Sequence, residues 1–175
     1  MNRKVILYIA MSLDGYIARD DGDISWLSIV ESQGEDYGYS DFIKAVDTVV
    51  MGRKTYEQVL TFGGAFPHRE RKCYVLSKSR KGKDENVEFY NGPIDQLITA
   101  IRQSEGLNIF CDGGAEIVFE LMKQNLIDRF VISIIPVFLG SGITLFHAGR
   151  PEQRLKLTQC KAFPSGLAQL WYERA

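Results

Sequence analysis

One segment of the sequence combines a glycine, two cations and a threonine directly after a short apolar run. Residues 49–51 are Val-Val-Met, and Gly52, Arg53, Lys54 and Thr55 follow. If a strand ends here and a helix starts, free backbone N–H groups and the helix dipole favour an anion, and both cations suit a phosphate. We expect Thr55 to cap this helix. The alternative is an ordinary turn with solvated cations, since the segment is neither a P-loop nor a G-x-G-x-x-G fingerprint.

A second segment repeats this arrangement. Residues 109–111 are Ile-Phe-Cys, and the sequence continues with Asp112, Gly113, Gly114, Ala115 and Glu116. Paired glycines at a strand end allow a tight turn or the close approach of a bulky ligand, although a turn chosen for backbone geometry alone would look the same. Two such helix starts on one parallel sheet suit the separate phosphates of a dinucleotide. A phosphorylated cofactor is therefore the leading hypothesis.

The segments around these turns alternate between short β-branched runs and helical stretches. We expect strands at residues 5–10, 48–51, 73–76, 87–90, 108–111 and 129–137, and helices at 39–46, 55–60, 94–104 and 115–124. This alternation predicts a three-layer α/β fold with a mostly parallel central sheet and helices on both faces. Residues 155–162 and 168–173 should pair as a C-terminal antiparallel hairpin. The length predicts one domain spanning residues 1–175.

Charge, cysteine and histidine content narrow the classes of function. The 21 basic and 22 acidic residues leave a net charge of −1, so nothing global attracts nucleic acid or an anionic membrane. The apolar run at residues 5–11 ends in Ser-Leu-Asp-Gly without the small-residue cleavage site of a signal peptide, and a proline and a Gly-Ser-Gly turn interrupt the uncharged stretch 130–149. The three cysteines are expected to be buried thiols in a reducing cytoplasm. Two histidines, without metal-ligand spacing, predict no protein-held metal.

These segments resemble a known superfamily. The stretch 49–57 looks like the cofactor-phosphate segment of dihydrofolate reductases, and residues 71–77 look like their next strand. Residues 12–18, 112–116 and 136–146 are more similar to the riboflavin-biosynthesis reductase, the C-terminal domain of bacterial bifunctional deaminase-reductases. The chain therefore resembles the dihydrofolate reductase-like superfamily from about residue 5 to residue 146, and the resemblance implies an NADPH cofactor.

The resemblance also implies how NADPH would lie. Residues 52–55 would hold its phosphates, with Arg53 nearest the 2′-phosphate, and Ser77 and Lys78 would flank the adenosine. Residues 112–116 would lie beside the pyrophosphate and the nicotinamide, with a cis bond between the two glycines. Ala10 and the loop 13–24 would cover the nicotinamide.

Substrate residues follow less directly from the sequence. The spacing of dihydrofolate reductases places their carboxylate at Asp36, and Arg71 matches their folate-binding arginine, although both residues also fit charged loops. Asp14 is a candidate for orienting the substrate, or it only forms a turn. Ser133 follows residues 131–132 on a late central strand. We expect Asp14 and Ser133 to face one cavity near the paired glycines.

The predicted function is that of an NADPH-dependent oxidoreductase acting on a nitrogen heterocycle or its sugar appendage. A substrate of the 5-amino-6-(5-phosphoribosylamino)uracil type is favoured, with a dihydrofolate or pterin reductase as the alternative. Residues 56–59 replace the Asp-Asp-Pro segment that the riboflavin-type reductase uses toward its ribose phosphate, which weakens the case for that substrate. The alternative from another class is a non-catalytic NADP(H)-binding module.

Two apolar segments of the sequence suggest that the protein assembles into an oligomer. The uncharged segment 130–146 and the aromatic end Leu170-Trp171-Tyr172 hold more apolar surface than one sheet edge needs. Riboflavin-type reductases also pair as dimers. We therefore expect a homodimer that binds a small heterocyclic substrate.

Overall fold

The computed structural model describes residues 3–175, and its main feature is a nine-stranded sheet in the order β10-β11-β8-β1-β7-β3-β4-β6-β5. The strands are β1 (Val5–Ser12), β3 (Val46–Gly52), β4 (Lys72–Leu76), β5 (Gly82–Lys83), β6 (Glu88–Tyr90), β7 (Asn108–Gly113), β8 (Arg129–Ile135), β10 (Leu155–Ala162) and β11 (Ala168–Arg174). The strands from β8 to β6 in this order run parallel, while the β10–β11 hairpin and β5 add antiparallel pairs at the two edges. The mostly parallel sheet and the C-terminal hairpin are therefore confirmed.

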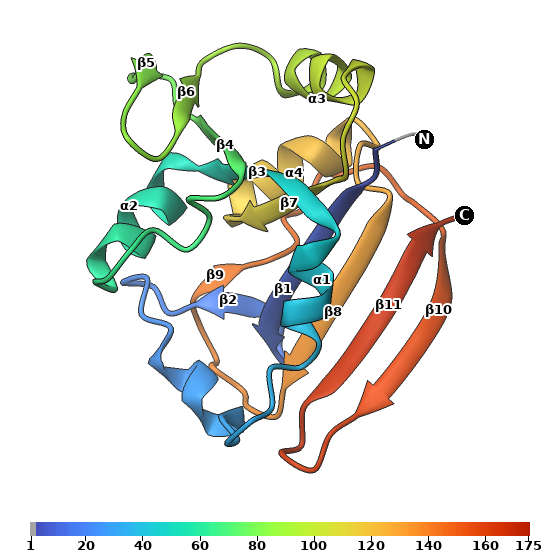
Figure 1. Ribbon diagram of the computed structural model, residues 1–175. Helices are drawn as coiled ribbons and strands as arrows, with labels where there is room; N and C mark the ends of the chain where they lie inside the picture. The colour runs from blue at the N-terminus through green and yellow to red at the C-terminus, as the bar shows by residue number, and fades with distance from the viewer. Residues whose placement is uncertain (1–2) are drawn as a thin grey trace.

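Helices cover both faces of the parallel part of the sheet. They are α1 (Tyr39–Lys44), α2 (Arg53–Thr61), α3 (Ile94–Gln103) and α4 (Ala115–Lys123), with a short 3-10 helix, η1 (Ser25–Val30). Apolar residues of α3 and α4 pack into one core cluster, whereas those of α1 and α2 pack into a second cluster. Figure 1 shows α1 in front of the sheet and α4 behind it. This arrangement confirms the three layers.

The periodicity of α3 illustrates why these elements form. Ile94, Leu97, Ile98 and Ile101 recur at helical spacing, and all four side chains are buried. The central strands instead bury apolar side chains on both faces, as parallel strands between two helix layers must. The expected helices and strands therefore agree closely with the structure, because each carries its pattern in its own sequence.

Two local expectations are wrong. Thr55 does not cap α2, because the helix begins at Arg53 and Gly52 is its N-cap. Cys160 is exposed on the edge strand β10, unlike the buried Cys73 and Cys111. Gln159 and Lys161 flank it in the sequence, and no further strand pairs with β10 to cover it among residues 3–175.

Several short elements were not expected. Strand β2 (Tyr16–Ala18) pairs with β9 (Ile143–Thr144) in a separate two-stranded sheet. Strand β5 forms inside the charged loop of residues 77–86, where its partner is β6. These strands are two or three residues long, so they carry too little periodicity to be recognised. Within residues 3–175, none of the helices is long and apolar enough to span a bilayer.

Candidate active site

The two glycine turns lie side by side where β3 and β7 end. These strands are parallel neighbours, and α2 and α4 start immediately after Gly52 and Gly114. The Gly113–Gly114 peptide bond is cis, as the family resemblance implied. A Cβ atom added to Gly52 would lie 3.1 Å from Ile117, and one added to Gly114 would lie 3.2 Å from the Thr55 hydroxyl. The two turns therefore approach each other too closely for side chains to fit without a shift.

A cavity of about 580 Å³ opens beside these turns, and we call it the central cavity. It brings together most of the residues expected to hold a cofactor: Ala10, Gly52, Lys54, Thr55, Asp112, Gly113, Gly114, Ala115 and Glu116. Tyr8 and Tyr39 also line it and add aromatic rings to its wall, which the sequence did not predict. The cavity therefore joins both glycine turns to the end of β1, as expected for the carboxyl edge of a parallel sheet.

The loop of residues 13–24 forms one wall of the central cavity. Ile17, Ala18, Gly22 and Ile24 line it, and the Gln58 amide donates a hydrogen bond of 2.8 Å to the Gly22 carbonyl. Pairing of β2 with β9 also fixes the loop. The loop therefore lies where the family resemblance places a cover.

Ser77 and Lys78 line a separate, smaller cavity of about 390 Å³, which we call the edge pocket. It also contains Ile117, the side chain that contacts Gly52. Ser77 is buried, and its hydroxyl accepts the backbone N–H of Arg80 at 3.0 Å. The edge pocket and the central cavity thus lie near the same glycine turn.

Arg53 lies outside the lining of the central cavity. Its guanidinium pairs with the Glu57 carboxylate at 2.9 Å, one helical turn along α2, and Arg80 lies 3.6 Å from the same carboxylate. Both arginines are substantially exposed. A phosphate at Arg53 would therefore have to compete with Glu57.

Asp112 forms the most unusual polar pair of the site, with His68. The His68 Nε2 atom lies 3.1 Å from an Asp112 carboxylate oxygen, and the histidine side chain is only 4% exposed. The Phe66 and Phe110 rings pack nearly perpendicular to the imidazole, with ring centres 5.6 and 5.8 Å from its own. The Nδ1 atom is buried without a hydrogen-bond partner among residues 3–175. His68 is not predictable from the sequence, since a lone histidine 44 residues from Asp112 gives no signal of proximity.

A cavity of about 630 Å³, here called the acidic cavity, adjoins the central cavity. Both cavities share Tyr8, Ala10 and Leu27, and the acidic cavity also contains Asp36 and Ser133. Asp36 lies in the turn before α1 rather than on a helix. Hydrogen bonds from the Ser40 side chain, and then from the backbone N–H groups of Ser40 and Gly38, hold the pKa of Asp36 below its usual range.

Asp14 and Arg71 do not line these cavities. The Asp14 carboxylate accepts hydrogen bonds from the Ser12 hydroxyl and from the backbone N–H groups of Leu139 and Gly140. The cavity expected to join Asp14 and Ser133 beside Gly113 is therefore not observed, because these contacts hold Asp14 in the loop. Arg71 donates to the Ile43 carbonyl at 3.1 Å, and its buried Nε lacks a partner within the described range 3–175.

We expect Asp14→Ala to destabilise the fold more at pH 7 than at pH 3. Partial desolvation raises the pKa of Asp14, but the hydrogen bonds from Ser12, Gly140 and Leu139 outweigh it and lower the pKa overall. A depressed pKa in the folded state contributes stability that is present above the unfolded pKa, about 3.9, and is lost as the pH falls through the folded value. Urea denaturation at both pH values measures this difference. An equal loss at both pH values, or the same effect from Glu105→Ala at an exposed position, would contradict the assignment.

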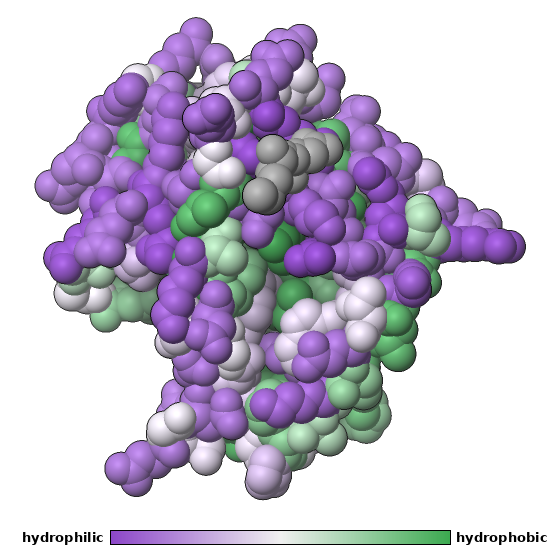
Figure 2. Space-filling view, turned by 45° about the vertical axis from the view of Figure 1, so that its right-hand side comes forward, coloured by the Kyte–Doolittle hydropathy of each residue, from purple (hydrophilic) through white to green (hydrophobic). Residues whose placement is uncertain are grey.

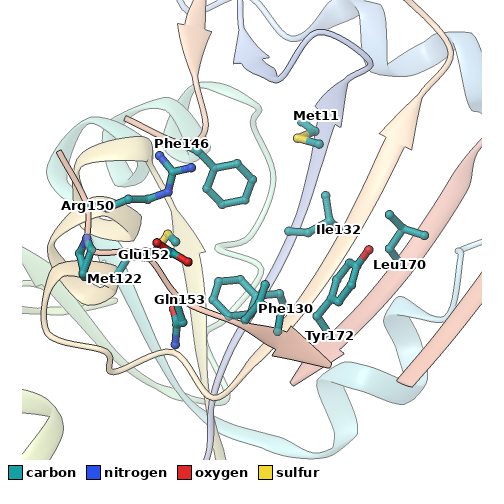
Figure 3. A pocket seen from close by; sticks show the side chains of 12 residues that line it. Met11, Met122, Phe130, Ile132, Phe146, Arg150, Glu152, Gln153, Leu170 and Tyr172 are labelled. Atoms are coloured by element: carbon teal, nitrogen blue, oxygen red, sulfur yellow. The ribbon is translucent and has the colours of Figure 1, made fainter. Parts of the chain in front are cut away.

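A third large cavity lies away from the glycine turns, on the face of the sheet formed by β1, β8 and β11. It has a volume of about 530 Å³. Figure 3 shows Met11, Ile132 and Leu170 projecting from these strands toward it, while Arg150 and Phe146 approach from the opposite side. Figure 2 shows hydrophobic side chains in a recess of the molecular surface and along its right-hand edge. We call the cavity of about 530 Å³ the sheet-face cavity.

The fold and the site define a class of protein. A mostly parallel sheet with a C-terminal hairpin carries two glycine turns that border a cavity at its carboxyl edge. Helices cover both faces, and a loop after the first strand walls the cavity. These features define a dihydrofolate reductase-like α/β protein.

Within this class, the chain belongs to the family described as the RibD C-terminal domain, which matches residues 3–169. It is 47% identical to the uncharacterized protein YwjB of Bacillus subtilis (strain 168) over 176 residues, with 100% of each chain covered. A solved putative riboflavin biosynthesis protein from Shewanella sp. PV-4 is 30% identical, with a TM-score of 0.90 over 98% of this chain and 99% of that one.

A more distant relative is the diaminohydroxyphosphoribosylaminopyrimidine deaminase/5-amino-6-(5-phosphoribosylamino)uracil reductase of Thermotoga maritima. It is 14% identical, with a TM-score of 0.74 over 99% of this chain and 57% of that one. Its likeness concerns the fold alone.

Proposed function

We propose that the protein is an NADPH-dependent reductase of a nitrogen heterocycle. The observation that carries this proposal is the central cavity, which two glycine strand ends border and which adjoins the acidic cavity. One cavity suits a cofactor ring and the other a substrate ring. Membership in the RibD C-terminal domain family supports a reductase in general. The choice of NADPH and of the heterocycle is our proposal.

The chain has groups that fit a dinucleotide. At Gly52 and Gly114 backbone rather than side chain borders the central cavity, and α2 and α4 begin there with free N–H groups. Lys54 adds a cation to the cavity wall, and Ser77 and Lys78 are available in the edge pocket for the adenosine end. When bound, NADPH would supply a hydride. The chain must then orient the heterocycle, exclude water and supply a proton.

Asp112 is our candidate for handling that proton. Its carboxylate lines the central cavity and contacts His68, so the pair can hold a proton at the wall of this cavity. Ile17 and Ile24 in the covering loop add apolar surface that limits water. The substrate would enter from the acidic cavity, where Ser133 and Asp36 offer polar contacts.

Cofactor preference tests the proposal. We expect NADPH to bind about tenfold or more tightly than NADH, because Arg53 and Lys54 can make charge-assisted hydrogen bonds to its phosphates. Fluorescence titration measures both dissociation constants, and Arg53→Ala should narrow the difference. Equal dissociation constants in the unmodified protein would contradict the choice of NADPH.

Turnover separates an enzyme from a binding module. NADPH consumption should appear with a member of a panel of aminopyrimidines and pterins. Tight NADPH binding without oxidation across the panel would instead favour the non-catalytic NADP(H)-binding module.

We also propose that the protein acts in the cytoplasm on a small molecule, without nucleic acid or membrane as partner. Burial raises the pKa of the Cys73 and Cys111 thiols to about 12, so both are protonated and unreactive at neutral pH. Three free thiols in one chain suit a reducing compartment. NADPH is the reductant of such a compartment.

A homodimer is the expected assembly. The sheet-face cavity exposes apolar side chains beside β10, where Leu155 and Leu157 are 39% and 50% exposed. A second copy covering this face would need an interface of about 1,000 Å² or more. Light scattering should give twice the mass of the chain, and Leu157→Lys should shift the protein toward monomer. A monomeric mass of the unmodified protein at micromolar concentration would contradict this expectation.

A further inference from the structure

The charged side chains that line the acidic cavity are all negative. Glu31, Glu35 and Asp36 line it, while no lysine, arginine or histidine among residues 3–175 does so. All three acidic residues are exposed at the rim. A ligand that enters this cavity therefore meets negative charge at its mouth.

The negative potential of this rim extends to the inner wall of the cavity. The pKa of Tyr8 is raised, mainly because the side chain is buried. The hydrogen bond from Gln169 lowers this pKa, whereas the negative charges of Asp36 and Glu35 raise it further. Tyr8 lines the acidic and the central cavities. The Glu35 carboxylate is held in place, since it accepts the backbone N–H of Tyr37 at 2.8 Å. A second anion placed here would meet the same repulsion as the tyrosinate form of Tyr8.

The inner wall of the cavity offers hydrogen bonds to a neutral ligand. The Gln169 Nε2 atom donates to the Ser133 hydroxyl at 3.0 Å and to the Tyr8 hydroxyl at 3.1 Å. Tyr8 in turn donates to the Tyr37 carbonyl at 2.9 Å. The Ser133 hydroxyl hydrogen is left to donate to a ligand carbonyl or ring nitrogen, since its oxygen only accepts among the bonds of residues 3–175.

Gln169 supports this wall without lining the cavity itself. This residue is fully buried, and its Oε1 atom lacks a hydrogen-bond partner within the described part of the chain. A buried acceptor without a partner is costly, while the Nε2 atom of the same amide holds the Ser133 and Tyr8 hydroxyl groups. The amide is therefore a positioning residue that fixes both hydroxyl groups at the wall of the cavity.

We propose that the acidic cavity selects an uncharged or cationic amino-heterocycle and discriminates against its phosphorylated form. Amino groups of the ring would donate to Glu35 or Asp36, and a ring carbonyl would accept from Ser133. A phosphate dianion would face like charges without a cation to neutralise it. This inference rests on the proposed reductase function, and it changes the substrate class from a phosphoribosyl compound to an unphosphorylated pyrimidine nucleoside or a pterin.

Lys161 is a basic residue that could bind a substrate phosphate and so oppose this discrimination. Its ammonium lies 4.2 Å from the centre of the Phe163 ring, and Phe163 packs against Tyr37 at the border of the acidic cavity. The cation–π contact with Phe163 holds the Lys161 ammonium group over this ring. If Lys161 instead bound a substrate phosphate, Lys161→Ala would weaken the phosphorylated ligand alone.

The test compares two probes that differ only in the phosphate. These are 5-amino-6-ribosylaminouracil and its 5′-phosphate, titrated calorimetrically into the NADPH-saturated protein. We expect the unphosphorylated probe to bind about tenfold or more tightly, equivalent to about 1.4 kcal/mol. Equal or tighter binding of the phosphate, or binding of neither probe, would overturn the inference. Failure of the protein to bind NADPH in a separate titration would instead count against the proposed function.

Charge-neutralising variants identify the cause of the discrimination. Glu31→Gln and Glu35→Gln together should narrow the ratio of the two dissociation constants severalfold, mainly by improving binding of the phosphate. Glu105→Gln, at an exposed position outside the cavity lining, is the matched control and should leave the ratio unchanged. Gln169→Glu should weaken both probes, and Gln169→Met, which lacks the amide, should do the same. A ratio that does not respond to the double substitution would overturn the role of the acidic rim.

Discussion

Replacing Asp112 by asparagine is expected to lower kcat by about 100-fold or more while changing the NADPH dissociation constant by less than about threefold. Asparagine keeps the size of the side chain and can accept a hydrogen bond from His68, but it cannot release a proton. Asp112 lines the central cavity, and its partner His68 is almost completely buried. A loss confined to turnover is therefore the signature of a proton-handling group.

The companion substitution His68→Gln separates proton handling from positioning. Glutamine can still donate a hydrogen bond to Asp112, so we expect partial activity and a changed pH profile of kcat. Asp41→Asn is the control, since Asp41 is highly exposed on α1 and pairs with Lys44. An unchanged kcat in Asp112→Asn would show that the proton comes from another group. A large loss of NADPH affinity would assign Asp112 to cofactor binding.

The second large effect is expected at the paired glycines. Gly113 has a φ of +100°, a backbone conformation that strongly favours glycine, and its α-carbon faces the central cavity beside Ile9. Gly113→Val would place a β-branched side chain where the cofactor approaches. We expect NADPH affinity to fall by about 100-fold or more, and the free energy of unfolding to fall by about 1–3 kcal/mol through backbone strain.

A matched control separates the loss of NADPH affinity from the loss of stability. Gly149 has a φ of +87°, and a Cβ atom there would meet open space. Gly149→Val should therefore destabilise the protein by a similar amount without changing NADPH affinity. Fluorescence titration gives the affinity, and urea denaturation gives the stability. Normal NADPH binding by folded Gly113→Val would contradict the placement of the cofactor at this turn.

Several parts of the fold and site could be predicted because their signals are local. Each strand and helix of the central sheet carries its own apolar periodicity, and each glycine turn lies within a few residues of a strand end. The alternation of these elements then dictates a mostly parallel sheet, whose carboxyl edge collects the turns. Gly52 and Gly114 were identified in this way, and the structure places them beside each other.

Contacts between distant segments could not be predicted from one sequence. The β2–β9 pair, the contact of His68 with Asp112, and the bonds of Gln169 to Ser133 and Tyr8 join residues that are from 36 to 161 positions apart. Such pairs have no local pattern, because the geometry of the whole sheet brings them together.

The roles of individual acidic and basic side chains show the same division. The class of fold, the two glycine turns after strands and the resemblance to a reductase all follow from the amino-acid sequence. Asp14, Asp36 and Arg53 were equally plausible in their roles. The contact of Asp14 with Leu139 joins residues 125 positions apart and exists only in the folded chain, whereas Asp36 and Arg53 pair with neighbours four residues along. Tertiary structure alone decided which carboxylates line a cavity and which hold a loop, because a side chain's neighbours, unlike its type, depend on how the whole chain packs.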